Sequence, residues 1–275
     1  TETVIVAKKD TSITTVMKSS GGSTISDNSS LPVPFTMYDT ATLSGMTANA
    51  GGSVTYNLYT NTNCSGTPIF TSGPHTAVNG IVPNSNSTSI TGATIHNWQV
   101  VYTGDASNNG STSGCGTETV YGQVQPSITT VMQYSNGTVI PDTATMTGFS
   151  ATPDQGSANV SYNLYNNNDC SGTPIFSSQV SVNSSGVIPN SSTTTMNFSG
   201  TYNWQAVYEG NRTNLPASSV CGTETFTVKA GTPAITTTMK TGSTTVPQGG
   251  SIQLPKSVYD QAVLGGVTND ARGTV

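Results

Sequence analysis

Charged residues and histidines are scarce in this chain, and it has no long hydrophobic run. Lys, Arg, Asp and Glu make up 8% of the 275 residues, there are two histidines, and the net charge is −5. The eight basic residues are spread along the chain and form no basic patch, so we expect no nucleic-acid partner. No stretch of about 18 apolar residues occurs, so we expect no membrane insertion within this sequence.

Helical periodicity is also absent. Apolar and polar residues instead alternate in short segments that are bounded by clusters of Gly, Pro, Asn and Asp, which is typical of all-β proteins. Ser and Thr account for 84 residues and Asn for 24. The sequence therefore predicts an all-β fold whose solvated faces are covered by hydroxyl and amide groups rather than by charges.

The chain repeats itself with a period of 106 residues. Cys64 and Cys170 are 106 residues apart, and so are Cys115 and Cys221. The strings SVTYNLY, from Ser53, and CSGTPIF, from Cys64, return as NVSYNLY and CSGTPIF, and the strings NWQ and CGTET also recur. This period is close to the commonest domain size, so one copy is long enough to bury its own core.

Matches at the two ends predict that the repeat continues in a longer tandem array. Residues 1–4 (TETV) match the end of a copy, and residues 234–239 (AITTTM) match the start of one. We do not expect the terminal pieces to fold as independent domains. The predicted parts are the last strand of a preceding repeat (1–11), two complete repeats (12–124 and 125–229) and the first strands of a third (230–275).

Each complete copy contains two cysteines at the same spacing. A zinc site needs four ligands and the sequence has no C-x-x-C motif, so we favour a disulfide within each repeat over a metal site. The predicted pairs are Cys64–Cys115 and Cys170–Cys221, in loops at one end of each repeat. Disulfides indicate an oxidising compartment, and we expect an extracellular or cell-surface location.

Alternating segments predict seven to eight strands in each copy. Val54, Tyr56 and Leu58 share one face of a segment, and Trp98 and Tyr102 share one face of another. So many short strands in one period predict tandem immunoglobulin-like β-sandwich repeats. The strands expected in the first copy are 12–17, 40–46, 53–60, 67–72, 75–82, 88–93, 95–103 and 116–124.

The copies differ after the first strand, where the first and third contain a segment that the second lacks. We expect a surface loop or a split edge strand there, around Leu31 and Leu254. The linkers between copies, 123–126 and 229–233, are short and each ends in proline. Proline fixes φ and favours extended geometry in its predecessor, so we expect stiff joints and an elongated array.

Three strings resemble the immunoglobulin-like repeats of very large bacterial and archaeal surface proteins. They are YNWQAVYEG at 202–210, YTGD at 102–105 and CGTE at 115–118. The resemblance covers both complete copies and the start of the third. It implies a domain exposed on a cell surface in a stalk, adhesin or filament, and it implies no catalytic residues. The second copy departs from the pattern at Asn211, where the first has Asp105.

No set of catalytic residues recurs in both copies. His75 and His96 are the only histidines, so no Ser–His–acid or Cys–His site can operate in each repeat. Tyr202 of the second copy lies where a tyrosine corner would, and His96 occupies the same position in the first copy. A position of this kind in the core favours a structural role for the histidine. We therefore expect no enzymatic activity and no cofactor.

Carboxylates recur at two positions. Asp39, Asp142 and Asp260 occupy one, and Glu2, Glu118 and Glu224 occupy the other. A Ca²⁺ site with Asp105 as a further partner is one interpretation. We favour a simpler one, in which Asp caps a turn before its strand and Glu bonds backbone or hydroxyl groups at a strand start, so no metal site is predicted.

Lysine cross-links and glycans are the remaining candidates for modification. Lys18 and Lys240 invite an intramolecular isopeptide link, but Gln133 fills the position in the second copy, so we do not expect one. Ten Asn-x-Ser/Thr sequons occur, close to the number expected by chance, and Asn63 is set aside because it precedes Cys64. The remaining candidates are Asn28, Asn86, Asn109, Asn136, Asn159, Asn183, Asn190, Asn197 and Asn211.

The leading hypothesis is a structural repeat of an extracellular filament, surface coat or stalk, without catalysis. Its expected partners are copies of itself or neighbouring repeats. The alternatives are adhesin repeats that bind carbohydrate or a partner protein, and an enzyme whose catalytic domain lies outside this sequence. Near-identical core strings in successive copies favour the structural hypothesis.

Overall fold

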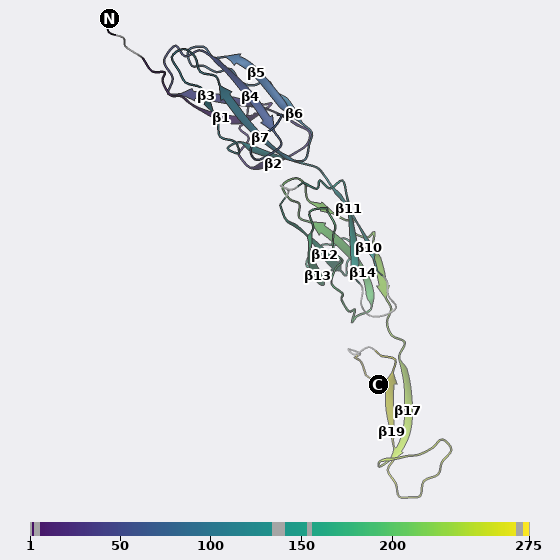
Figure 1. Cartoon of the computed structure of the whole chain (residues 1–275). Helices are drawn as coiled ribbons and strands as arrows, with labels where there is room; N and C mark the ends of the chain where they lie inside the picture. Colours follow the sequence, from purple (N-terminus) through teal and green to yellow (C-terminus); the bar gives the residue numbers. More distant parts are fainter. Residues whose placement is uncertain (1, 3–5, 134–140, 153–155, 268–271, 275) are drawn as a thin grey trace.

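A computed structural model describes the chain at residues 2, 6–133, 141–152, 156–267 and 272–274. These residues form nineteen strands and no helix, so the fold is all-β, as predicted. The strands fall into three sets, because strands pair only within the stretches 12–123, 127–228 and 234–265 (Figure 1). The domain boundaries themselves stay a prediction.

The first set forms two sheets that face each other, as a β-sandwich requires. Three strands pair in the order β1-β3-β6, and five pair in the order β2-β9-β7-β4-β5, with β8 beside β7. The strands are β1 (Ser12–Ser19), β2 (Ser29–Pro32), β3 (Phe35–Ser44), β4 (Ser53–Tyr59), β5 (Phe70–Thr76), β6 (Thr88–Ile90), β7 (Ile95–Tyr102), β8 (Ser111–Thr112) and β9 (Thr119–Gln123).

The segment that the second copy lacks contributes β2. This strand leaves the sheet of β1 and β3 and runs parallel to β9 at the edge of the other sheet, with Leu31 opposite Gly122. Of the two structures expected for this segment, a surface loop or an edge strand, the first copy has the edge strand, and it links the two sheets by pairing with the last strand.

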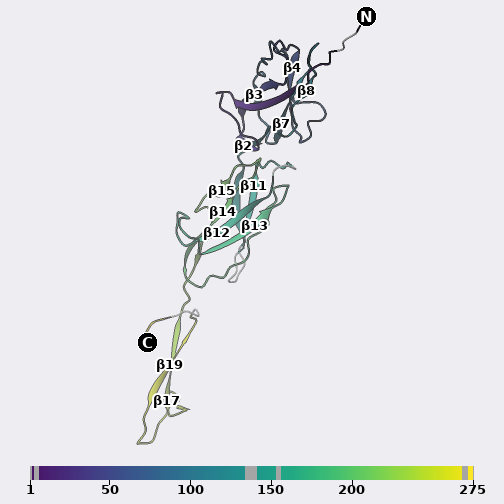
Figure 2. The same ribbon diagram turned by 90° about the vertical axis from the view of Figure 1, so that its left-hand side faces the viewer.

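The second set repeats this arrangement with small differences. β10 pairs with β11, and the larger sheet has the order β13-β12-β14-β15, with β16 also beside β14 (Figure 2). The strands are β10 (Ser127–Met132), β11 (Asp142–Thr147), β12 (Ala158–Tyr165), β13 (Phe176–Val182), β14 (Gly200–Tyr208), β15 (Ala217–Ser218) and β16 (Thr225–Val228).

Aromatic side chains fill the space between the sheets of each set. The residues predicted to face inward, Val54, Tyr56 and Leu58, are fully buried. Trp98 packs edge-on against Tyr56 and Phe70, with ring centroids 6.5 and 5.9 Å apart. In the second set, Trp204 meets Phe176 in the same geometry at 5.9 Å. Edge-to-face contacts add to the free energy gained by burying apolar area, so each tryptophan anchors its core.

Several of the predicted strand boundaries are wrong: β3 begins at Phe35 rather than at residue 40, and β8 was not predicted. The segments 67–72 and 75–82 were expected to be separate strands, but β5 runs through 70–76 as one strand. Its pairing with β4 shifts register between Val54 and Tyr56, beside Gly73 with φ 114°, so a bulge rather than a turn produced the break in alternation. Residues 78–81 form a turn instead, in which Val78 and Ile81 exchange backbone hydrogen bonds.

The third set is a hairpin with a short third strand. β17 (Ala234–Thr241) pairs with β18 (Thr244–Thr245) and β19 (Tyr259–Gly265). Met239 is 50% exposed here, whereas its counterpart Met17 is 1% exposed in the first set. Among the described residues, buried apolar side chains cluster only in the first and second sets. The hairpin therefore presents a face that a second sheet covers in the other copies.

Candidate functional site

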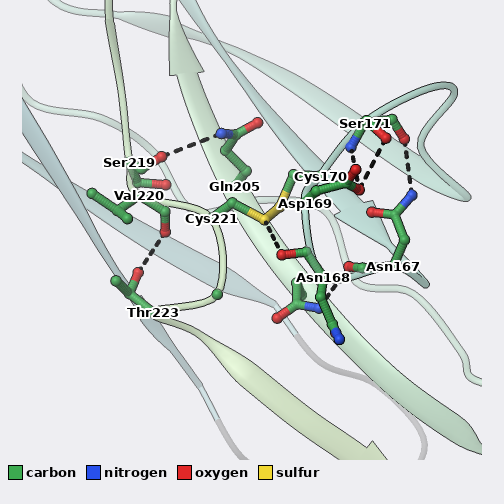
Figure 3. Close-up of a disulfide and its surroundings, with 12 residues drawn as sticks. Asn167, Asn168, Asp169, Cys170, Ser171, Gln205, Ser219, Val220, Cys221 and Thr223 are labelled. Carbon is green, nitrogen blue, oxygen red and sulfur yellow. Dashed lines mark hydrogen bonds between the residues drawn. A yellow bond between two sulfur atoms is a disulfide. The ribbon is translucent and has the colours of Figure 1, made fainter.

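Both predicted disulfides are present, Cys64–Cys115 and Cys170–Cys221. The Cα atoms are 5.8 Å apart in each, within the usual range for a disulfide. The first cysteine follows β4 or β12, and the second lies in the turn before β9 or β16. Figure 3 shows the Cys170–Cys221 bond of the second repeat. The bond therefore joins two loops at one end of the larger sheet. Two disulfides suggest an oxidising, extracellular environment.

An asparagine that the sequence analysis did not single out supports each disulfide loop. Asn97 is fully buried, and its Nδ2 donates to the Asn61 carbonyl at 2.8 Å while its Oδ1 accepts from the Thr119 hydroxyl at 2.5 Å. Asn203 makes the equivalent bonds to Asn167 and Thr225. The recurring NWQ string was the available signal, since a polar residue preserved beside a core tryptophan needs buried partners.

The recurring carboxylates do not cap turns, so that interpretation is wrong for Asp39 and Asp142. Asp39 lies within β3 and Asp142 is the first residue of β11, and both are fully buried, opposite Met17 of β1 and Met132 of β10. The backbone N–H of Asp39 donates to the Ser85 hydroxyl at 2.8 Å, and that of Asp142 donates to Ser191 at 2.7 Å. The aspartates thus belong to the core.

The recurring glutamates lie next to these aspartates, on the side of the larger sheet. Glu118 is 5% exposed and lies before β9, and its carboxyl group contacts that of Asp39. Glu224 contacts Asp142 in the same way, and its Oε1 accepts the Met132 N–H at 2.5 Å. The interpretation of Glu as a backbone-bonding residue holds for Glu224. No local sequence pattern predicts the contact between the Asp and Glu side chains.

Burial raises the pKa of these carboxyl groups because the charged form loses its hydration. The pKa of Asp39 rises to about 9, through desolvation and then the nearby Glu118 charge, and that of Glu118 to about 7, mainly through desolvation. Desolvation followed by the Glu224 charge raises the pKa of Asp142 to about 8. Asp260, at the same position in the third copy, is exposed.

Asp105 organises a turn. Its Oδ1 accepts the N–H groups of Ser107 and Asn108, at 2.7 and 2.8 Å, and its Oδ2 accepts the Gly51 N–H at 2.7 Å. These donors, the Gly51 N–H first, lower the pKa of Asp105 to about 2. Asn211 accepts the equivalent turn bonds from Thr213 and Asn214, at 3.1 and 2.8 Å. The carboxylate oxygens of Asp105 therefore accept hydrogen bonds from N–H groups, and these groups occupy the directions from which a Ca²⁺ ion would be bound.

The same turn receives the chain that precedes each repeat. The Lys9 N–H donates to the Ser107 carbonyl at 2.9 Å, and the Lys9 carbonyl accepts the Asn109 N–H at 2.8 Å. Val124, between the first and second sets, makes the matching bonds to Thr213 and Leu215 at 3.0 and 2.9 Å. Each linker is thus paired in parallel with the turn of the repeat that follows it.

Side chains add to the joint at Val124. The Gln123 side chain donates to the Asn211 carbonyl at 2.8 Å, and the Ser150 hydroxyl donates to the Ala93 carbonyl at 2.8 Å. The Arg212 guanidinium lies 5.3 Å from the centroid of the Tyr121 ring, a cation–π distance. Sequence reasoning predicted a stiff joint from proline, but these contacts were not foreseen.

The histidines and lysines have structural contacts. His96 is 2% exposed in the core, and desolvation lowers its pKa to about 4. His75 shares a 2.8 Å hydrogen bond with the Ser72 hydroxyl. Lys18 and Lys240 donate to the hydroxyls of Thr24 and Thr245, each at 2.7 Å, rather than facing an asparagine.

The sequons differ in exposure, and glycosylation stays a prediction. Asn159 is half-buried on the face opposite the buried Val160, and its Nδ2 donates to Glu209 at 3.0 Å. Asn211 is half-buried in its turn, and Asn136 lies outside the described residues. The exposed candidates are Asn28, Asn86, Asn109, Asn183, Asn190 and Asn197.

Comparisons with known proteins identify no family. No protein-family model matches the chain, and no curated protein matches its sequence. Within the described residues, no three His, Cys, Asp or Glu side chains gather in a way that could hold a metal ion. The same residues include no helix with the length and apolar character needed to cross a bilayer.

Proposed function

We propose that this chain is a structural repeat module of an extracellular filament, surface coat or stalk, built from tandem immunoglobulin-like sandwiches and without catalysis. The observation that carries the proposal is the equivalent docking of Lys9 and Val124 on the turns of the repeats that follow them. A joint made by backbone pairing limits bending between repeats. Such a joint suits an elongated scaffold better than a flexible tether does.

The strand order supports the immunoglobulin-like assignment. A first strand that moves from one sheet to the other and then runs parallel to the last strand, as β1, β2 and β9 do, is compatible with that fold. The Tyr202 hydroxyl also donates to the Phe198 carbonyl four residues upstream at 2.9 Å, which is the geometry of a tyrosine corner.

Edge strands offer a route for copies to associate side by side. β13 pairs with β12 over seven consecutive residues without a register shift, and it contains no charged residue. β5, its counterpart, is interrupted by a bulge and contains Pro74, both of which discourage further pairing. If lateral assembly occurs, β13 is therefore the better edge, and pairing there favours a filament or coat over a single stalk.

Electron microscopy and small-angle scattering of the full chain test the scaffold proposal. We expect straight particles in which each sandwich adds roughly 35–45 Å, given ordinary strand lengths. Lateral contacts would appear as paired or sheet-like particles at high concentration. A compact particle with the two complete repeats folded back on each other would contradict the proposal.

A second candidate function is a carbohydrate-binding adhesin. The second repeat has a surface cavity of about 540 Å³ lined by Phe176, Phe198 and Tyr202 together with hydroxyl and amide side chains. Phe198 is 65% exposed, and Gly92 holds its position in the first repeat, so the copies differ here. Binding on a glycan array that is lost in Phe198→Ala would favour this candidate, whereas no binding by the wild type would remove it.

A further inference from the structure

The buried carboxyl pairs are not explained by the scaffold function. Asp39 Oδ1 accepts the Thr40 N–H at 2.7 Å, but Asp39 Oδ2 and Glu118 Oε2 are buried and have no N–H or O–H donor in the part of the chain that the structure describes. Among the described residues, Glu224 Oε2 is in the same situation. The Thr143 N–H is near enough to Asp142 to favour its charged form, but it makes no full hydrogen bond to either oxygen. Buried oxygens without donors are costly, and two carboxylates in contact would also repel each other.

A single proton between the two carboxyl groups removes both costs. A protonated aspartate becomes a donor, and the glutamate then accepts an O–H···O⁻ hydrogen bond, which is short and strong. Glu118 is held as the acceptor by the Thr15 hydroxyl and the Met17 N–H, which also bond its carboxyl group. We infer that each complete repeat contains a carboxyl–carboxylate pair, Asp39–Glu118 or Asp142–Glu224, that shares a proton in the folded state.

A metal ion fits these surroundings less well than a proton. The Thr40 and Met17 N–H groups and the Thr15 hydroxyl already point at the pair in the first repeat. A Ca²⁺ ion needs six to eight oxygen ligands, and these positions present hydrogen atoms instead. The geometry therefore selects the smallest cation, a proton.

The neighbouring groups do not neutralise the pair. Tyr56 of β4 and Tyr162 of β12 face the aspartates, and their hydroxyls donate to the carbonyls of Pro83 and Pro189, each at 2.8 Å. Asp27 lies close enough to Glu118 to disfavour its charge. Burial beside the pair also raises the pKa of both tyrosines, so they stay neutral over the range in which the carboxyl groups titrate.

The shared proton makes the stability of the repeats depend on pH in an unusual direction. A carboxyl group whose pKa is raised by folding binds more protons in the folded state than in the unfolded state, so stability is highest in acid. This extra stability is lost as the pH rises from about 4, the pKa of the carboxyl group in the unfolded chain, through the higher pKa of the same group in the folded state. Over that range the unfolding equilibrium constant increases about tenfold per pH unit for each proton released.

Urea unfolding of the full chain between pH 5 and 10 tests this inference. The variant is Asp39→Asn combined with Asp142→Asn, because an asparagine amide can donate to the glutamate permanently. We expect the wild type to lose stability as pH rises and the variant to have a flatter profile. The matched control is Asp260→Asn, an exposed residue at the same repeat position, which should leave the profile unchanged.

Equal pH slopes in the wild type and the double variant would overturn the inference. If the variant does not fold, carbon NMR of the wild-type carboxyl groups gives a second readout. A shared proton predicts that Asp39 and Asp142 remain protonated well above pH 5, and ordinary titration near pH 4 contradicts it. Addition of Ca²⁺ at constant ionic strength should not stabilise the protein, and a calcium-dependent rise in the urea midpoint would reassign the pair as a cation site.

Discussion

Asp105 and Asn211 occupy the same position in the two repeats and accept equivalent hydrogen bonds, although one is charged and the other is neutral. What the turn needs is an acceptor oxygen, since buried N–H groups must find partners. We therefore expect Asn211→Asp to leave the second repeat as stable as the wild type. Asn211→Ala should cost about 1–3 kcal/mol because it leaves the Thr213 and Asn214 donors unpaired.

Hydrogen exchange measured by mass spectrometry checks this prediction segment by segment. In Asn211→Ala, exchange should become faster only in the turn at 209–216 and in the linker that pairs with this turn. The first repeat serves as an internal reference. Equal protection in the alanine and aspartate variants would show that the acceptor oxygen contributes nothing.

Because His96 is buried in the first repeat, we expect acid to change the stability of this repeat differently from that of the second. Burial lowers the folded pKa of this histidine to about 4, so its neutral form contributes stability that is present above the unfolded pKa of about 6.5. This contribution is lost as the pH falls from about 6.5 towards 4, because the unfolded state binds a proton that the folded state excludes. The shift corresponds to about 3 kcal/mol at full loss.

Comparison of the wild type with His96→Gln isolates this effect from that of the carboxyl pairs. The difference in first-repeat stability between the two proteins should change between pH 7 and 4, whereas the second repeat, which has no histidine, should behave alike in both. A difference that stays constant with pH would contradict a neutral buried imidazole.

At the scale of elements, each disulfide ties the loop after β4 or β12 to the turn before β9 or β16. The two cysteines enclose a separation of 51 residues, and closing a loop of this length stabilises the fold by about 4 kcal/mol in the chain-entropy model. Replacing both Cys170 and Cys221 by Ser should destabilise the second repeat by about that amount, as measured by urea unfolding. The first repeat keeps its own disulfide as a control, and a loss below about 1 kcal/mol would contradict the prediction.

The elements that sequence predicted well are those whose signal is local. Alternation placed Tyr56, Trp98 and Tyr102 in the core because the face of a strand is decided by a period of two residues. The same rule wrongly predicted two strands in place of β5, because a bulge interrupts the alternation of apolar and polar residues just as a turn does. Asp39 lies in β3 of one sheet, and Glu118 directly precedes β9 of the other, 79 positions later in sequence. Their contact follows from the packing of the two sheets, which no local sequence pattern predicts.

At the scale of the whole molecule, the joint between repeats rests on the pairing of Val124 with the turn at 213–215. Val124→Pro removes the N–H that donates to the Thr213 carbonyl, while Val124→Ala keeps it. One such hydrogen bond is worth about 0.5–1.5 kcal/mol, enough to populate bent arrangements that the wild type rarely visits. We expect small-angle scattering and electron microscopy to show a broader range of bend angles for the proline variant than for the alanine variant.

The stability of the individual repeats provides the control for that experiment. Val124 lies outside the strands of both repeats. The urea midpoint of each repeat should therefore be the same in the proline variant, the alanine variant and the wild type. If the proline variant bends no more than the alanine variant, the backbone pairing at Val124 does not set the stiffness. The side-chain contacts of Gln123, Ser150 and Arg212 would then be the remaining source of order at this joint, and the scaffold proposal would depend on side chains from both repeats.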